Sequence, residues 1–392
     1  MLRSIVQYFQ TKSDGKVVRS RMEAISQEQN RKYNTTFGIL SAIAMVMIVA
    51  GHADCNILTV GELFPYYSFH VPLFVFISGY FYRPEEEKHP VAYLKKKCRR
   101  LLVPYFFWNV FYGLVAWGLR AAGLFAIGGD FSIWNLFVEP FVSGYQFLYN
   151  YAAWFVPALF LIEVGNLVMR LLLKKLYLCH EWLILAITLL VGMAVVWLAI
   201  GGHVWGIYKM PGRLLFLYPF FQMGQIYAHH LEKHDRLSNA AYFAIVLGIQ
   251  FVITITCGGL AYSSVWCTGF ANGPVIPYVS AVTGIAFWLR ICRILSPALE
   301  KCSAVLSLGN NTYAVMMHHV MAFMLVKVVL AVLSGSLGVF ADFDWEQYRT
   351  NVEYFYLAGR AESFKLVYLG AGIVLPLLLQ KLFDKRKENR KL

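Results

Sequence analysis

Long apolar stretches separated by short polar ones dominate this chain. About ten stretches are each close to the ~20 residues that a membrane-spanning helix needs, although the second is short. They cover residues 36–53, 67–82, 103–124, 153–173, 183–200, 213–231, 239–260, 274–294, 311–333 and 364–382. Continuous apolar runs favour helices over the short alternating strands of a transmembrane barrel. The pattern therefore predicts an all-α, polytopic membrane helical bundle of about ten transmembrane helices.

Composition and charge agree with this prediction. Hydrophobic residues make up 58% of the 392 positions and charged residues 15%, which is unlike a soluble domain. A cytoplasmic N-terminus places 28 of the 35 Lys and Arg residues on the cytoplasmic side, as the positive-inside rule requires. We therefore expect both ends inside, with basic tails at 1–33 and 384–392 around a membrane domain at 34–383. The net charge of +13 then reflects contact with anionic membrane lipids, and nucleic acid is not an expected partner.

Two histidines mark the outer ends of the first two apolar stretches. His52 closes the first stretch and His70 begins the second, so antiparallel helices would bring the two imidazoles close together. Imidazole exchanges a proton near neutral pH, and an ionisable group in a membrane helix is a candidate for function. For either histidine alone, a place at the water interface is an equally good explanation.

Further ionisable groups fall deeper in the predicted helices. Glu163 lies about 13 Å from the outer end of its helix, where it could serve function or join helices as a hydrogen-bonded acid. His318 and His319 are also expected near mid-depth. Adjacent helical residues point in different directions, so only one of these two histidines can face a given partner.

Two surface features suggest ligands. The predicted cytoplasmic loop before residue 101 carries a cationic cluster, which suits either lipid contact or capture of a polyanionic cytosolic donor: Lys95, Lys96, Lys97, Arg99 and Arg100. The predicted outer loops at 125–152, 261–273 and 335–363 mix aromatic residues with carboxylates, which suits a sugar or ordinary loop packing. The seven cysteines form no metal-binding set, so no metal is expected, and a Cys257–Cys267 disulfide is one option.

Five motifs, in this order, resemble the membrane acyltransferase 3 family: IVAGH at 48–52, FHVPLFVFISGY at 69–80, RRLLVPY at 99–105, AWFVPALF at 153–160 and LGNNTYAVMMHH at 308–319. The resemblance extends from about residue 34 to 382. Members of this family are ten-helix, acyl-CoA-dependent O-acyltransferases of bacterial surface polysaccharides. The resemblance therefore implies a multi-pass protein of the bacterial plasma membrane that works beside polysaccharide synthesis machinery.

The resemblance also implies a reaction and roles for the residues. An acyl group, acetyl in the first instance, would pass from acyl-CoA as co-substrate to a hydroxyl of a glycan or lipid-linked sugar, without a tightly bound cofactor. His52 would be the general base, and His70 a second candidate or an orienting group. Glu163 would fix a histidine tautomer or stabilise an imidazolium. The developing oxyanion would be stabilised by His319 or Arg213, and the cationic cluster would hold the phosphates of CoA. The residues implied for acceptor binding are Trp154, Arg213 and Trp345.

The chain departs from the family pattern in two places. The family has a basic residue eleven positions before the first histidine, where this chain has Ser41. Either Arg31, Lys32 or Arg213 takes its place, or activity is lost or altered. Val320 stands where proline usually follows the last histidine, and the spacing from Gly309 favours His319 over His318 as the family histidine.

Two other functions stay open at this point. A transporter of glycans or lipid-linked precursors could use the buried histidines and Glu163 as a proton path, and a catalytically inactive subunit could bind without turnover. For the enzyme, the donor is cytosolic whereas His52 is expected near the outer side. The pantetheine arm would therefore have to reach through the bundle, or a cavity would have to shorten the path.

Overall fold

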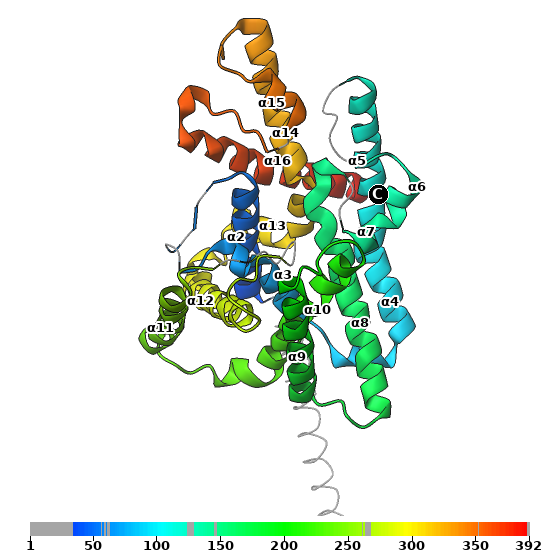
Figure 1. Ribbon diagram of the computed structural model, residues 1–392, viewed down its shortest axis with the longest axis vertical. Coiled ribbons are helices and arrows are strands. Elements are labelled where there is room, and N and C mark those ends of the chain that lie inside the picture. The colour runs from blue at the N-terminus through cyan, green and yellow to red at the C-terminus, as the bar shows by residue number, and fades with distance from the viewer. Residues whose placement is uncertain are drawn as a thin grey trace, which may run out of the picture.

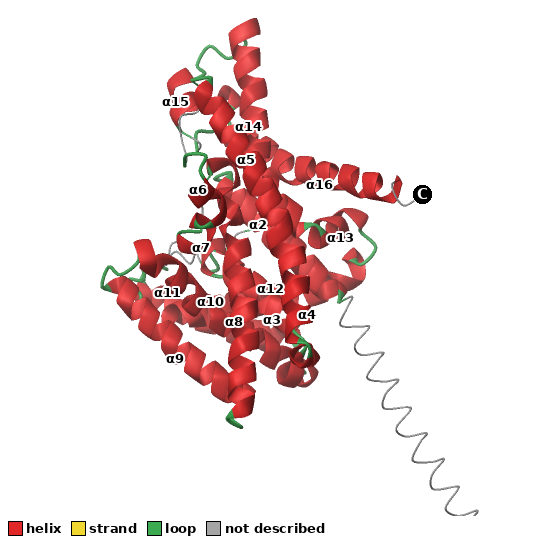
Figure 2. Cartoon of the chain, turned by 90° about the vertical axis from the view of Figure 1, so that its right-hand side faces the viewer, coloured by secondary structure: helices red, strands yellow, loops and turns green. Residues whose placement is uncertain are grey.

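The computed structural model describes residues 34–55, 57–58, 60, 63–123, 129–144, 147–260, 262, 268–351 and 353–389. These residues form helices joined by turns, with no β-strand among them, and Figures 1 and 2 show the arrangement. The all-α class is therefore confirmed. The tail predicted at 1–33 lies outside the described residues, as does Cys267, so the Cys257–Cys267 disulfide stays a prediction.

A helix occupies each of the predicted apolar segments. In chain order these helices are α2 (Thr35–His52), α3 (His70–Tyr80), α4 (Pro90–Lys97) continued by α5 (Val103–Ala121), α8 (Phe155–Lys175), α9 (Glu181–Ile200), α10 (Lys209–Ile226), α11 (Asn239–Cys257), α12 (Ile276–Leu299), α14 (Thr312–Leu337) and α16 (Lys365–Asn389). Shorter helices lie between them: α6 (Ile133–Phe137), α7 (Glu139–Val142), α13 (Ser303–Asn310) and α15 (Trp345–Thr350).

Among the described residues, 8 helices are long and apolar enough to cross a membrane. Of the predicted segments, α3 and α10 are the two that fall short of this criterion; α3 has only 11 residues. Most side chains of both helices are buried, and the two helices pack against each other. They therefore meet protein rather than lipid, which removes the need for a full-length apolar surface.

The contact between α3 and α10 depends on two glycines. A Cβ at Gly79 would lie 1.9 Å from the carbonyl oxygen of Phe221, and a Cβ at Gly224 would lie 2.1 Å from that of Phe76. The backbones can approach this closely only because neither residue has a side chain. Close backbone packing at these glycines therefore holds α3 in place, in addition to the packing of its apolar side chains.

The cationic cluster is helical, so its prediction as a loop is wrong. Pro90 begins α4 at its first position, where the missing N–H costs nothing, and the basic residues that follow have good helix propensity. A single π-type turn, Cys98–Leu102, joins α4 to α5. The cluster therefore continues directly into a membrane-spanning helix and carries some of its cations inward.

Helix α16 runs sideways in both views, whereas α8 is upright (Figures 1 and 2). It packs against α14 and α2, and its beginning lies next to the end of α2 (Figure 1). The bundle is thus not made of parallel helices throughout. The last long helix instead covers the end of the first one.

We predict that Gly224→Ala destabilises the fold by about 1–3 kcal/mol, because the added methyl group overlaps backbone atoms of α3. The measurement is the thermal unfolding midpoint of the purified protein in detergent. Gly165→Ala in α8 is the matched control, since a Cβ there meets nothing within 4 Å. Equal midpoints for the two variants would contradict the close packing described here.

Candidate functional site

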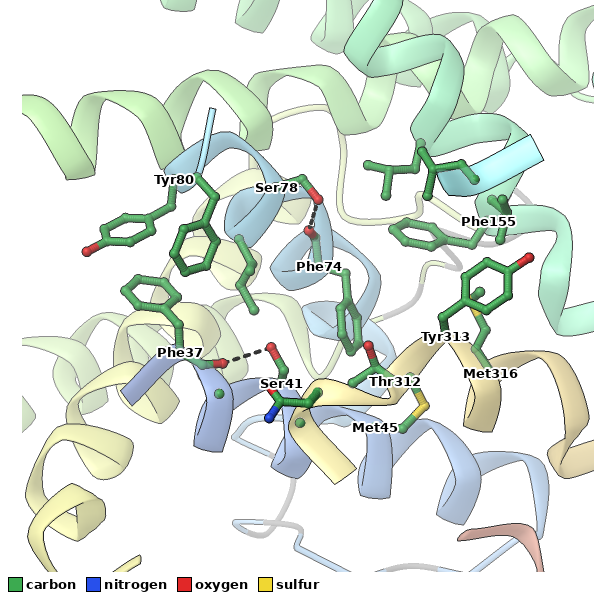
Figure 3. Close-up of a pocket in the computed structure, with 18 of the residues that line it drawn as sticks. Phe37, Ser41, Met45, Phe74, Ser78, Tyr80, Phe155, Thr312, Tyr313 and Met316 are labelled. Atoms are coloured by element: carbon green, nitrogen blue, oxygen red, sulfur yellow. Dashed lines mark hydrogen bonds between the residues drawn. The ribbon is translucent and has the colours of Figure 1, made fainter. Parts of the chain in front are cut away.

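A cavity of about 1120 Å³ lies between α2, α3, α4, α8 and α14. Its lining is apolar in the middle, where Figure 3 shows Phe37, Met45, Phe74, Phe155 and Met316 around the space. The cationic side chains that line it are Arg83, Lys96, Lys97 and Arg100, and the histidines are His52 and His70. The cavity therefore joins charged groups and imidazoles through an apolar middle.

The cavity extends along the whole length of α2. Both Thr35, at its beginning, and His52, at its end, line the space. At 1.5 Å per residue, these two positions lie about 25 Å apart along the helix. This length is comparable with the hydrocarbon core of a membrane, about 30 Å.

His52 and His319 form a hydrogen-bonded pair at the end of α2. The two atoms His52 Nδ1 and His319 Nε2 lie 2.7 Å apart, and the rings are nearly parallel. His319 is fully buried. The sequence predicts His52 at the outer end and His319 near mid-depth, but the contact shows that they lie at one level. Helices α13 and α14 both pack on α2, and a Cβ at Gly309 would lie 2.2 Å from the carbonyl oxygen of Gly38.

The hydrogen bonds fix the tautomers of this pair. His319 Nδ1 lies 2.8 Å from the carbonyl oxygen of Val315, and a carbonyl only accepts, so Nδ1 carries the proton. In a neutral imidazole the other nitrogen is then an acceptor. His52 Nδ1 must therefore donate to His319, which leaves His52 Nε2 with a free lone pair. That nitrogen can take up a proton.

This tautomer does not suit the role of oxyanion stabiliser that the family resemblance implies for His319. Because its Nε2 accepts from His52 and its Nδ1 donates to the backbone, neutral His319 has no proton to offer an oxyanion. Its geometry suits a positioning residue that orients His52. Tyr151, one of the aromatic residues of the predicted outer loop at 125–152, packs edge-on against His52 with ring centroids 5.1 Å apart.

His70 lines the same cavity but is held separately. Its Nδ1 lies 2.6 Å from the carbonyl oxygen of Tyr66, so His70 Nε2 is also a free acceptor when the ring is neutral. His318 points elsewhere: its Nδ1 lies 2.7 Å from the hydroxyl of Tyr112, and it is not among the residues that line the cavity. Of the adjacent pair, His319 is the one brought to His52.

Glu163 has a cationic partner rather than a histidine. Lys97 Nζ lies 2.6 Å from Glu163 Oε1, with both side chains largely buried. The interpretation that Glu163 fixes a histidine tautomer is therefore wrong for this structure. The pairing was hidden in the sequence because Lys97 was assigned to a surface loop, whereas α4 carries it to the cavity wall.

The cationic cluster divides in two. Lys96, Lys97 and Arg100 line the cavity, whereas Lys95 and Arg99 are not among its lining residues. Lys96 Nζ contacts Glu86 Oε1 at 2.5 Å. The helical period explains the division, since residues 96, 97 and 100 share one face and 95 and 99 point away from it.

The three predicted acceptor residues do not form one site. Trp154 lines the cavity, but Arg213 stacks behind it, with the guanidinium 4.2 Å from the ring centroid and a hydrogen bond to the Ser143 carbonyl at 2.6 Å. Trp345 lies on α15 against Phe343 and Tyr348, away from the cavity lining. Arg213 thus does not occupy the place of the missing basic residue.

Ser41 faces the cavity and donates a hydrogen bond to the Phe37 carbonyl at 2.8 Å (Figure 3). Arg31 and Lys32, proposed above as substitutes, lie outside the described residues. The cations that share the cavity with Ser41 are Arg83, which precedes α4, and Lys96, Lys97 and Arg100 from α4 and the turn after it. Lys97 and Arg100 are thus among the cations that could take the place of the missing basic residue.

Three residues that line the cavity each carry a buried polar atom without a hydrogen-bond partner within the described part of the chain. These atoms are the hydroxyls of Tyr93 and Tyr313 and the Oε2 atom of Glu163. Buried polar groups usually have partners, so these three atoms, which are enclosed by protein, are exceptions beside the cavity. Neither tyrosine could be singled out from the sequence, because each has the pattern of an ordinary core aromatic.

The comparisons with known proteins identify the family. The model of the acyltransferase domain family, acyltransferase 3, matches residues 38–383, which is nearly the whole chain. The chain therefore belongs to this family and, with its 8 candidate membrane spans among the described residues, is a multi-pass membrane acyltransferase. No curated protein and no solved structure matches it significantly.

We predict that Lys97→Met lowers the free energy of unfolding by about 1–3 kcal/mol, because it leaves the buried Glu163 carboxylate without its cation. The double variant Lys97→Met/Glu163→Gln should recover most of this loss. The measurement is the thermal unfolding midpoint in detergent, with the exposed Lys301→Met as control. A double variant less stable than Lys97→Met would show that the ion pair is not the cause.

Proposed function

We propose that this membrane acyltransferase transfers an acyl group, acetyl in the first instance, from acyl-CoA to a sugar hydroxyl of a cell-surface polysaccharide or its lipid-linked precursor. The cavity between the α4 cations and His52 is the observation that carries the proposal. A bacterial plasma membrane is the setting we infer, beside the machinery that makes the polymer.

The cavity lining suits an acyl-CoA donor as substrate. Lys96, Lys97 and Arg100 would bind phosphate oxygens, for which ammonium and guanidinium groups are common partners. The apolar middle would take the pantetheine chain. Such a path would solve the problem of a cytosolic donor and a distant base, because the thioester would move within the protein.

The reaction that follows is direct acyl transfer. His52 Nε2 takes the proton of the sugar hydroxyl while the hydroxyl oxygen attacks the thioester carbonyl carbon, and a new C–O bond forms. The C–S bond then breaks, and the thiolate sulfur receives the proton from His52. The products are an O-acyl sugar and free CoA thiol, and the imidazole returns to its starting state.

Other residues would support His52 in this scheme. His319 holds the tautomer in which His52 Nε2 is free, and its own proton is anchored on the Val315 carbonyl. Glu163 holds Lys97 in the cavity wall until an anionic donor competes for the cation. His70 is the second candidate base, since it lines the same cavity with a free Nε2.

We expect His52→Ala to lower acyl transfer by about 10²–10⁴-fold, the contribution typical of a positioned imidazole. Purified protein would be given labelled acetyl-CoA and surface glycan extracted from the source cells, and acylated product would be measured. The control is His318→Asn, which keeps a polar group near the Tyr112 hydroxyl outside the cavity. Turnover supports an enzyme, binding of acetyl-CoA without turnover by the unaltered protein supports an inactive subunit, and neither result supports a transporter.

We expect His319→Leu to lower the transfer rate by about tenfold or more, because the Nδ1–H group of His52 loses a hydrogen bond of about 1.5 kcal/mol. His319→Gln should restore most of the rate, since its side-chain oxygen can accept from His52 where Nε2 did. Both variants would be compared at equal thermal stability. Equal losses for Leu and Gln would argue against a positioning role.

A further inference from the structure

A second pocket lies at the end of α2 that is opposite to the cations. Its volume is about 360 Å³, and the residues just after His52 line it together with the beginning of α16: Asp54, Cys55, Ile57, Glu362, Ser363, Lys365 and Leu366. We call this the outer pocket. Asp54 follows His52 by two residues, and His52 is the last α2 residue that lines the larger cavity. The histidine pair therefore has a cavity on one side and the outer pocket close to the other.

Three charged groups shape the outer pocket. Lys365 Nζ lies 2.7 Å from Asp54 Oδ2 and 2.7 Å from Glu362 Oε2. The lysine side chain is only 13% exposed, whereas each carboxylate is 76% exposed. The cation thus sits at the base and leaves the carboxylates able to accept further hydrogen bonds. Ile57 and Leu366 add apolar wall.

The backbone of Asp54 is unusual in a way that fits a binding role. Its φ of 50° lies in the left-handed region, which Asp tolerates better than most residues. Backbone strain of this kind gathers at binding and catalytic sites. Here it follows directly on the end of α2 and turns the carboxylate toward Lys365.

Tyr66 connects the outer pocket with the histidines. Its carbonyl holds His70, and its ring lies against Gly51, where a Cβ would be 2.4 Å away. Burial raises the pKa of Tyr66, and the nearby carboxylate of Asp54 raises it further. Its hydroxyl therefore stays protonated beside Asp54 and is a hydrogen-bond donor in the same region.

We propose that the outer pocket binds the sugar ring of the acceptor, so that donor and acceptor reach His52 from opposite ends of α2. This inference rests on the proposed function. Carboxylates accept hydrogen bonds from sugar hydroxyls, the Lys365 ammonium donates to them, and the apolar walls meet the C–H face of the ring. Two carboxylates and one ammonium leave a net negative charge, so a neutral sugar or an amino sugar is favoured over a uronic acid.

Cys55 offers a direct test, since it lines the outer pocket and is a free thiol. Intact cells that make the protein would be treated with a bulky, membrane-impermeant maleimide. The treatment is done above neutral pH, because burial raises the pKa of the Cys55 thiol. We expect surface-glycan acylation, measured by mass spectrometry, to fall to the level of cells that lack the protein. In a Cys55→Ser variant the reagent should leave acylation at its starting level.

Two results would overturn the inference. One is a Cys55 that does not react with the external reagent, which would mean that the pocket does not open to the outer side. The other is full acylation by protein labelled at Cys55. If cells with the untreated protein show no acylation at all, the proposed function itself fails, and this outcome is separate from the other two.

Variants of the charged groups test the contacts themselves. We expect Asp54→Asn and Lys365→Met each to lower transfer to extracted surface glycan by about tenfold, as the loss of one charged hydrogen bond predicts. Binding of acetyl-CoA should not change, because the donor cavity lies on the other side of His52. The control is Asp130→Asn, which breaks the exposed pair with Arg120. Parallel losses of donor binding and transfer would assign these residues to the fold instead.

Discussion

The hydrogen bond between His52 and His319 is the interaction on which the rest of the site depends. It joins the end of the first membrane helix to the interior of α14, across most of the length of the chain. The direction of this hydrogen bond is set by the Val315 carbonyl. Because that carbonyl can only accept, His319 donates to it from Nδ1 and accepts from His52 at Nε2. One backbone oxygen therefore decides which nitrogen of His52 is free, and among the described residues no carboxylate makes a hydrogen bond to this histidine.

The apolar surroundings make this arrangement effective. His52 is partly buried and lines the cavity, whereas its partner His319 is fully buried, and an unsatisfied polar group is costly in a membrane interior. In the proposed function, the large cavity would give the free nitrogen a route to a substrate, and the α4 cations at the other end would bind an anionic one. Lys97 pairs with one oxygen of Glu163 inside the same space, so the lysine is held in place by a carboxylate whose second oxygen has no partner within the described residues.

Much of the fold could be predicted from the sequence, and some of the site could not. Continuous apolar runs identified every long helix among the described residues, and the buried position of α3 explains why so short a segment belongs among them. The pairing of His52 with His319 could not be predicted, because the two residues are 267 positions apart in the sequence and meet only through the packing of α14 on α2. Lys97 was assigned to a loop because basic residues near a membrane look like a surface cluster, although Pro90 and the helix period already indicated a helix. Trp345 and Arg213 were chosen by residue type alone, and packing against Phe343 and Trp154 takes them out of the cavity.

The other charged residues of the cavity explain why a serine can occupy position 41. A cationic side chain on α2 and one on α4 would both face the cavity. A positive charge in the cavity therefore does not have to come from α2. With Lys97 and Arg100 on the opposite wall, an arginine at 41 would add a third positive group beside two that are already close together. A small hydroxyl that bonds to its own helix leaves room and keeps the middle of the cavity nearly apolar. The departure from the family pattern thus shifts the charge from one wall to the other, and the histidine end of the cavity is unaffected.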